Sequence, residues 1–156
     1  MYSFFRLGVL AAIVLFAFQG HLVAQDHGFG AGIIVGEPTG VSVKGWLSPT
    51  TAIDAGLAWS MVHETSFHVH ADYLIHAFHA FETEEEIPLY YGIGGRIKTG
   101  ENGEDARFGV RMVIGVDYMF RDAPIDIFLE VAPILDLTPA TELQMNAGLG
   151  ARFWFK

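Results

Sequence analysis

The strongest constraint on the fold is a strict alternation of residue types along the C-terminal segment 143–155. Every odd-numbered position from Leu143 to Phe155 is apolar, and the even-numbered positions between them carry Gln, Asn, Gly, Arg and one Trp. Successive side chains of a β-strand point to opposite faces, so a period of two predicts a strand with one apolar and one polar face.

Seven further segments show the same alternation, most clearly 107–120 and 67–76, where the apolar set opposes charged residues, His or Gly. Turn-forming residues at 37–40, 48–51, 100–103 and 121–124 separate several of them. The chain is therefore predicted to be all-β, one domain of eight antiparallel strands. The predicted strands are 27–36, 41–47, 52–60, 67–76, 89–98, 107–120, 125–132 and 143–155.

The face opposite the apolar one is rich in Gly and carries isolated charges of both signs. This combination is typical of a transmembrane barrel, with apolar side chains toward lipid and small or polar ones toward the lumen. Strands cross a membrane only as a closed barrel, because every backbone polar group in lipid must be paired. We therefore predict an eight-stranded up-and-down transmembrane β-barrel, in which inward Gly residues make room for larger side chains on neighbouring strands.

The first 24 residues have the features of a cleaved signal peptide. Arg6 supplies the positive charge, Leu7 to Phe18 form the apolar region, and cleavage is expected after Ala24, which leaves 25–156 as the barrel domain. An uncleaved anchor is the alternative, although the apolar region is short for a span. No apolar run of 18 residues follows, so a helical span is not expected in the mature chain.

Charge and composition exclude several functions. The formal net charge is −9, and removal of the leader takes away Arg6 and no acid, which makes it −10. Such an acidic chain is a poor partner for nucleic acid. The absence of Cys excludes disulfides and thiol catalysis. The acidic stretches 82–86 and 101–105 are predicted to be solvated loops rather than cation sites.

The inward-facing charges are the main candidates for a functional site. A charge in a narrow lumen must be paired or hydrated, so we expect a network of ion pairs that plugs the barrel. A gated channel, in which the network opens, is the alternative. The predicted network consists of Lys44, Asp54, Asp72, Arg96, Arg111, Asp117, Asp126, Glu130 and Arg152.

Three histidines, His68, His70 and His76, share the inward face of one predicted strand. A metal would need a third ligand beside His68 and His70, and Asp72 is in line for it. Ligands along one straight strand converge poorly on one ion, so structural hydrogen bonding is the preferred interpretation. We predict no metal and no other cofactor.

Catalysis is not expected. Ser60 and Ser66 lie near His63 and Glu64 in the sequence, and a nucleophile and base could meet there as in an outer-membrane enzyme that acts on lipid. No nucleophile-elbow motif accompanies them. The chain is therefore predicted not to be an enzyme.

Outward-facing aromatic residues should mark the two membrane interfaces if both termini lie in the periplasm. The connection 77–87 would then be periplasmic, where turns are normally short, and its length and acidity are unusual. The predicted interfacial aromatics are Phe29, Trp59, Phe67, Tyr91, Phe108, Tyr118, Phe120, Phe153 and Phe155.

Several strings, in this order, resemble a family of small outer-membrane β-barrels of Gram-negative bacteria that is similar in architecture to the OmpA and OmpX transmembrane domains. They are Gly36 to Gly40 followed by Ser42, Lys44 and Trp46; Asp72-Tyr73-Leu74 with His76; Tyr90 to Arg96; Pro124-x-Asp126-x-Phe128-x-Glu130-x-Ala132-Pro133; and Gly148 to Phe155. The resemblance covers essentially the whole mature chain. It implies an outer-membrane barrel and carries over no catalytic residue.

The segment Gly150-x-x-Phe153-x-Phe155 resembles the terminal signal that the barrel-assembly machinery recognises, although here Lys156 follows the final Phe. The expected partners are thus outer-membrane lipid and that machinery, and the predicted role is structural or in surface interaction. A small pore or transporter is the first alternative. A soluble periplasmic barrel, lipocalin-like, with the apolar set lining a ligand cavity, is the second.

Overall fold

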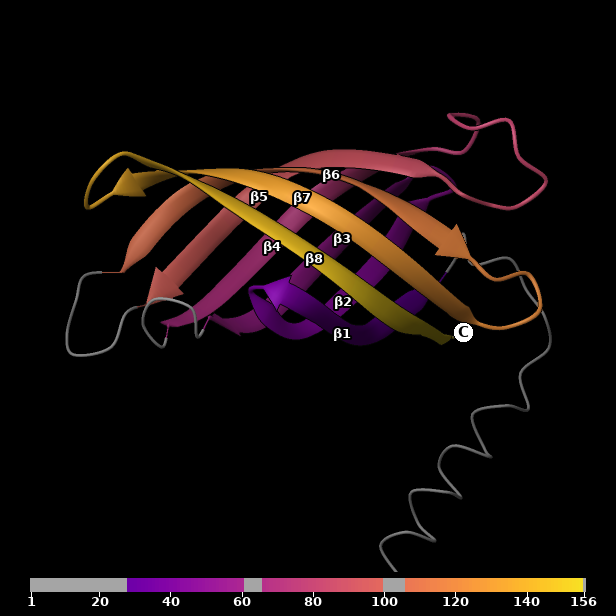
Figure 1. The fold of residues 1–156 in the computed structure, drawn as a ribbon, viewed down its shortest axis with the longest axis horizontal. Helices are drawn as coiled ribbons and strands as arrows, with labels where there is room; N and C mark the ends of the chain where they lie inside the picture. Colours follow the sequence, from indigo (N-terminus) through magenta and orange to yellow (C-terminus); the bar gives the residue numbers. More distant parts are fainter. Residues whose placement is uncertain (1–27, 61–65, 100–105, 156) are drawn as a thin grey trace, which may run out of the picture.

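The computed structural model describes residues 28–60, 66–99 and 106–155 (Figure 1). The eight predicted strands are all present, and they hydrogen-bond in sequence order into a closed barrel, which confirms the predicted fold class. The predicted signal peptide lies outside the described residues. The strands are β1 (Phe29–Glu37), β2 (Thr39–Ser48), β3 (Thr51–Ser60), β4 (Ser66–Ala77), β5 (Leu89–Thr99), β6 (Arg107–Met119), β7 (Ile125–Thr138) and β8 (Glu142–Phe155).

All neighbouring strands are antiparallel, and β1 closes the barrel against β8. This ladder runs from Phe29 opposite Phe155 to Glu37 opposite Ala147. Closure leaves no strand edge unpaired. The C-terminus and the connection between β4 and β5 lie at the same end of the barrel, here termed the terminal end (Figure 1).

Strand β7 is longer than predicted, since it continues past residue 132 to Thr138. The prediction stopped before Pro133, because proline cannot donate a ladder hydrogen bond. The barrel accommodates Pro133 by skipping pairs in one ladder only. Pairing with β6 omits Ala132 and Pro133, while pairing with β8 is continuous and places Pro133 opposite Met145.

Burial follows the predicted alternation of the strands. In β4, buried and exposed residues alternate strictly from Ser66 to His76. On the outward faces large apolar side chains are about half exposed, as with Ile93 at 57% and Leu129 at 53%. The inward faces hold the charged residues. The structure therefore places the apolar set outside the barrel and the charged set inside.

Inward Gly residues lie opposite the largest inward side chains. Gly56 pairs with His70 across β3 and β4, and Gly150 pairs with Phe128 across β7 and β8. A Cβ atom at Gly56 would overlap the imidazole of His70, and one at Gly150 would overlap the ring of Phe128. Each of these Gly residues thus leaves room for the bulky inward side chain that faces it.

The connection between β4 and β5 folds back onto the end of β6. Glu86 forms an isolated bridge with Met119, and the Arg121 guanidinium donates a hydrogen bond to the Glu84 carbonyl. Residues 82–86 are all exposed, in agreement with the predicted solvated loop. The acidic stretch 101–105 lies outside the described residues. Within the described ranges, no helix has the length and apolar character needed to cross a membrane.

Candidate functional site

Among the described residues, ten charged side chains are buried in the barrel interior, four basic and six acidic. All nine side chains of the predicted network are among them, and Asp136 is the tenth. The buried charged residues are Lys44, Arg96, Arg111, Arg152, Asp54, Asp72, Asp117, Asp126, Glu130 and Asp136.

Four of these form a cluster that spans β2, β6, β7 and β8, here termed the four-charge cluster: Lys44, Asp117, Asp126 and Arg152. Lys44 Nζ lies 2.5 Å from Asp117 Oδ2, and Arg152 Nη2 lies 2.9 Å from Asp117 Oδ1. Arg152 Nε lies 3.1 Å from Asp126 Oδ1, and the Trp154 indole donates to Asp126 Oδ2 at 3.0 Å. Every carboxylate oxygen of this cluster therefore accepts at least one hydrogen bond.

Aromatic rings surround the two cations of the four-charge cluster. Lys44 Nζ lies 5.0 Å from the ring centroid of Trp46 and 5.1 Å from that of Tyr90. The Arg152 guanidinium carbon lies 3.9 Å from the ring centroid of Phe128. Contacts of a cation with an aromatic face are favourable, and more so where water is excluded. The rings therefore both stabilise the cations and close off the space around them.

A second group of ion pairs is centred on Arg111 of β6. Its Nε donates to Asp72 Oδ2 at 2.7 Å, and its Nη2 donates to Glu130 Oε1 at 2.5 Å. The hydroxyl of Tyr90 donates to Glu130 Oε2 at 3.1 Å. One guanidinium thus connects carboxylates on β4 and β7 across the interior.

A third group joins Arg96 to Asp136, an acidic partner that is absent from the predicted network. Arg96 Nη2 lies 2.6 Å from Asp136 Oδ1 and 3.0 Å from Gln144 Oε1. Asp136 was missed because the predicted strand stopped at residue 132. Its even number places it on the same face as Asp126 and Glu130, so continued alternation would have found it.

Asp54 is the exception in the predicted network. It is 3% exposed and lies on β3 directly opposite Asp72 of β4. Among the described residues its side chain makes no ion pair, and its Oδ1 has no hydrogen-bond partner. The structure thus joins eight of the nine predicted residues through ion pairs and leaves Asp54 outside them.

The three inward histidines are buried where they were predicted, but the expected hydrogen bonds are missing at several ring nitrogens. Nε2 of His68, Nδ1 of His70 and both nitrogens of His76 have no hydrogen-bond partner in the described part of the chain. His76 Nε2 is 3.6 Å from Asp117 Oδ2, and its ring centroid is 4.4 Å from that of Trp46. Packing rather than hydrogen bonding therefore holds these rings.

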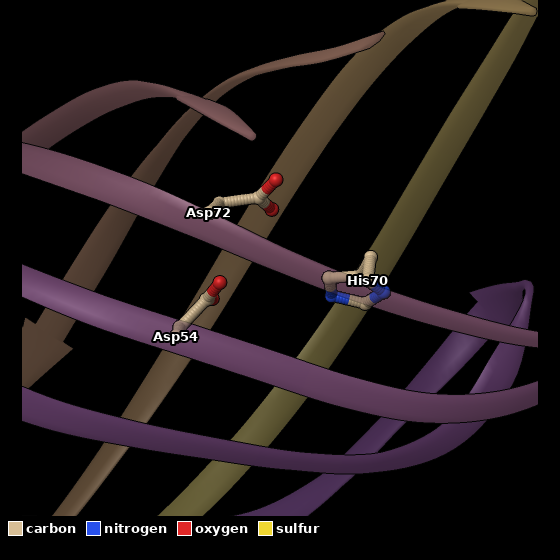
Figure 2. Close-up of side chains that lie close together, drawn as sticks. All are labelled: Asp54, His70 and Asp72. Atoms are coloured by element: carbon tan, nitrogen blue, oxygen red, sulfur yellow. The ribbon is translucent and has the colours of Figure 1, made fainter. Parts of the chain in front are cut away.

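Asp54, His70 and Asp72 lie together, here termed the Asp-His-Asp cluster (Figure 2). One ligand atom from each residue lies within 4.8 Å of the others. The ligands predicted from the sequence all lie on one strand, whereas Asp54 comes from the neighbouring strand β3. Finding this set from sequence requires the register between β3 and β4, which places Asp54 beside Asp72.

The serine–histidine arrangement considered for catalysis is not brought together by any described contact. His63 and Glu64 lie outside the described residues. Ser66 is buried, and its Oγ has no hydrogen-bond partner within the described ranges.

The predicted interfacial aromatics lie on outward positions near the two ends of the barrel. Near the terminal end, the ring centroids of Phe29 and Phe155 are 6.5 Å apart and those of Tyr118 and Phe120 are 4.7 Å apart. At the other end, Trp59 pairs with Phe67 across β3 and β4. The remaining members of the set are Tyr91 and Phe153, toward the terminal end, and Phe108, toward the other end.

Comparisons with known proteins support the fold. No family model matches the chain, and no curated protein matches it. The structure is similar to the N-terminal β-barrel domain of Pseudomonas aeruginosa OprF, with a TM-score of 0.58 and 15% sequence identity. The match covers 81% of this chain and 95% of that domain's chain, so the two share a barrel fold over most of their length.

Proposed function

We propose that the chain is an integral outer-membrane barrel of a Gram-negative-type cell, with a structural or surface-interaction role and an interior closed by its ion pairs. The observation that carries this proposal is the distribution of side chains between the two faces. Large apolar residues cover the outside of every strand, and the buried charges lie inside. The OprF-like fold and the sequence features of a signal peptide in residues 1–24 support the same location.

The outward face is unfavourable in water. Apolar side chains such as Ile33, Ile114 and Leu149 are more than half exposed, and similar residues surround the whole barrel. Soluble monomers rarely expose contiguous apolar patches larger than a few hundred Å². In lipid the same belt is favourable, because apolar side chains meet hydrocarbon and the closed ladder pairs the backbones of neighbouring strands.

The buried ion pairs of the interior support a structural role over transport. The ion pairs of the four-charge cluster and those of Arg111 are at most 6% exposed, and aromatic rings pack around them. Conduction would require these buried pairs to separate, which is strongly unfavourable when charges lose their partners. The lipocalin-like alternative does not fit the structure, because the apolar set does not line the interior.

The location is tested by extraction and by mobility on gels. The full chain, expressed with its leader in a Gram-negative host, should remain in the membrane fraction in buffer and enter solution only with detergent. The unheated sample should migrate differently from the boiled one, since a folded barrel resists the detergent of the gel. A folded, monomeric protein in buffer without amphiphile contradicts the proposal.

A matched pair of variants tests which face meets lipid. Leu129→Arg places a charge on the outward face of β7, and folding into lipid vesicles should lose about 2–4 kcal/mol if this position is near the bilayer centre. The control Ala140→Arg lies in the exposed connection between β7 and β8 and should fold like the original chain. Equal folding of both variants contradicts a lipid-facing role for β7.

The closed interior is tested by single-channel recording in planar bilayers. The purified barrel should give no steady open-channel current, because its ion pairs fill the lumen. A steady current that the Arg111→Ala variant alters would identify the chain as a small pore instead.

A further inference from the structure

We propose that the Asp-His-Asp cluster binds one divalent transition-metal ion inside the barrel, with Asp54, His70 and Asp72 as ligands. No metal is predicted from the sequence, because the candidate ligands there all lie on a single strand. Two adjacent strands supply the set: Asp54 lies opposite Asp72, and His70 is the next inward residue of β4. Figure 2 shows Asp54 on one strand and His70 and Asp72 on its neighbour, with the three side chains close together.

The spacing of the ligand atoms suits one ion. The three atoms lie within 4.8 Å of one another, and Zn²⁺ takes nitrogen and oxygen ligands at about 2.0–2.2 Å. Ligand atoms at that bond length from one ion lie closer together than 4.8 Å, so binding requires the three side chains to rotate toward the ion. One imidazole and two carboxylates are a ligand set for first-row divalent ions, and a fourth position is left for water.

The second, independent observation is that all three residues have buried atoms without a partner. Oδ1 of Asp54, Nδ1 of His70 and Oδ1 of Asp72 make no hydrogen bond among the described residues. The three residues are 3%, 6% and 2% exposed. Buried polar atoms in native proteins are nearly always satisfied, and each exception calls for a physical cause. Asp54 makes no ion pair among the described residues, and a cation bound by the three side chains would supply its missing partner.

Neighbouring residues restrict the orientation of two side chains of the cluster, Asp72 and His70. Arg111 Nε holds Oδ2 of Asp72 at 2.7 Å, which leaves Oδ1 turned away from that contact. Gly94 and Gly56 lie opposite Asp72 and His70, and a Cβ atom at either Gly would overlap the facing side chain. Contacts that fix the orientation of a ligand are a usual feature of protein metal sites.

The charge balance of the interior favours a divalent cation. Among the described residues six buried acids face four buried bases, so two negative charges stay unbalanced when all the acids are ionised. The excess lies near β3 and β4, because the sequence has no Lys or Arg between Lys44 and Arg96. Arg111, the base that reaches the cluster, is shared between Asp72 and Glu130. One M²⁺ ion balances the charge of the interior.

The test uses the folded chain in detergent micelles, purified without a polyhistidine tag and treated with EDTA. Titration with ZnSO₄ by calorimetry should give one site per chain, and elemental analysis after gel filtration should give one zinc per chain. Co²⁺ should give the visible absorption of a site with mixed nitrogen and oxygen ligands. The Asp54→Asn and His70→Gln variants should each weaken binding at least ten-fold.

Matched controls separate this site from binding at the surface. His79 is an exposed histidine in the connection after β4, and His79→Gln should leave the affinity unchanged. The heat-dependent gel shift verifies that every variant is a folded barrel, and Gly45→Ala, which meets no atom within 4 Å, serves as a neutral barrel variant. Zn²⁺ should raise the temperature of the gel shift for the original chain and not for Asp54→Asn.

Two results overturn the proposal. The first is no binding of Zn²⁺ or Co²⁺ at micromolar concentrations by a chain that the gel shift shows to be folded. The second is binding that Asp54→Asn leaves intact, which places the ion elsewhere. Neither result bears on the membrane location, because extraction and gel mobility measure that separately.

Discussion

Two clusters in the barrel interior are buried to a similar degree but differ in how many of their polar atoms have hydrogen-bond partners. In the four-charge cluster both carboxylates accept hydrogen bonds at each oxygen, from Lys44, Arg152 and Trp154. In the Asp-His-Asp cluster each residue retains an atom without a partner. Burial alone therefore does not determine what an acidic residue does inside a barrel. The donors within hydrogen-bond distance decide whether it stabilises the fold or remains available to a cation.

The difference originates in how bases are distributed among the strands. The four-charge cluster draws its members from β2, β6, β7 and β8, so bases and acids meet across the lumen. The Asp-His-Asp cluster draws on β3 and β4 only, and neither strand contains a Lys or Arg. Asp54 also has Lys44 as its ladder neighbour on β2, but the Lys44 ammonium is held by Asp117.

The largest expected effect is the loss of a shared carboxylate in the four-charge cluster. Asp117→Asn should lower the free energy of unfolding by about 3–5 kcal/mol, because Lys44 and Arg152 stay buried while their common partner loses its charge. Denaturant titration in lipid vesicles, followed by tryptophan fluorescence, measures the change.

The control for this variant is Asp122→Asn, an identical replacement at an exposed position in the turn before β7. Its unfolding free energy should stay within about 0.5 kcal/mol of the original. If Asp117→Asn is equally mild, the four-charge cluster does not stabilise the barrel and the contrast with the second cluster fails.

A second prediction, with a smaller effect than that of Asp117→Asn, tests the space around the Asp-His-Asp cluster. Gly56→Ala should cost about 1–3 kcal/mol, because the new Cβ atom overlaps the imidazole of His70 and the interior is tightly filled. Gly45→Ala, on the outward face of β2, should cost nothing, since its Cβ atom meets no atom within 4 Å. Equal stability of the two variants would show that His70 moves freely and is not held in place for a ligand.

The fold was predictable because it depends on a pattern that the chain repeats on every strand. Alternation assigns each side chain to a face without knowledge of its neighbours, so the eight strands, the inward Gly residues and nine of the ten buried charges follow from it. The exception is Asp136, which lies beyond Pro133. The predicted strand stopped before Pro133, because proline is unfavourable within a strand. In the structure, continuous pairing with β8 keeps β7 in strand conformation through Pro133.

The pairing of the charges was not predictable to the same degree. Alternation predicts that Asp54 faces inward and where it lies along its own strand, but not which residues of other strands lie beside it. Its lack of a partner depends on the register with β4 and on the competition between Asp54 and Asp117 for Lys44. The same holds for His70, whose neighbour Asp54 is 16 positions away in the sequence and one strand away in the barrel.

Asp54 and Asp72 pair across β3 and β4, but replacing each by Asn should have different effects on the free energy of unfolding when EDTA removes metal ions. Asp72→Asn should lower the free energy of unfolding by about 1.5–3 kcal/mol, because Arg111 loses a charged partner. Asp54→Asn should leave it unchanged or raise it by about 1 kcal/mol, because an acid without a partner is removed. Parallel denaturant titrations give both values. A loss at Asp54 as large as that at Asp72 would mean that Asp54 has a partner and that the second cluster is complete.

The smallest expected effect comes from an exposed ion pair, which tests whether burial or contact distance determines the strength of the ion pairs. Arg107 Nη1 lies 2.7 Å from Glu142 Oε2, as close as the buried pairs, but the two side chains are 34% and 52% exposed. Arg107→Ala should therefore lower the free energy of unfolding by less than about 1 kcal/mol, since water already solvates both charges. The same titration, repeated at high salt, should show the remaining difference decreasing. If this loss matched that of Asp117→Asn, contact distance rather than exclusion of water would govern the ion pairs. Burial of Asp54 without a partner would then be no more unfavourable than exposure of an acid at the surface. The physical reason for expecting Asp54 to bind a cation would be removed.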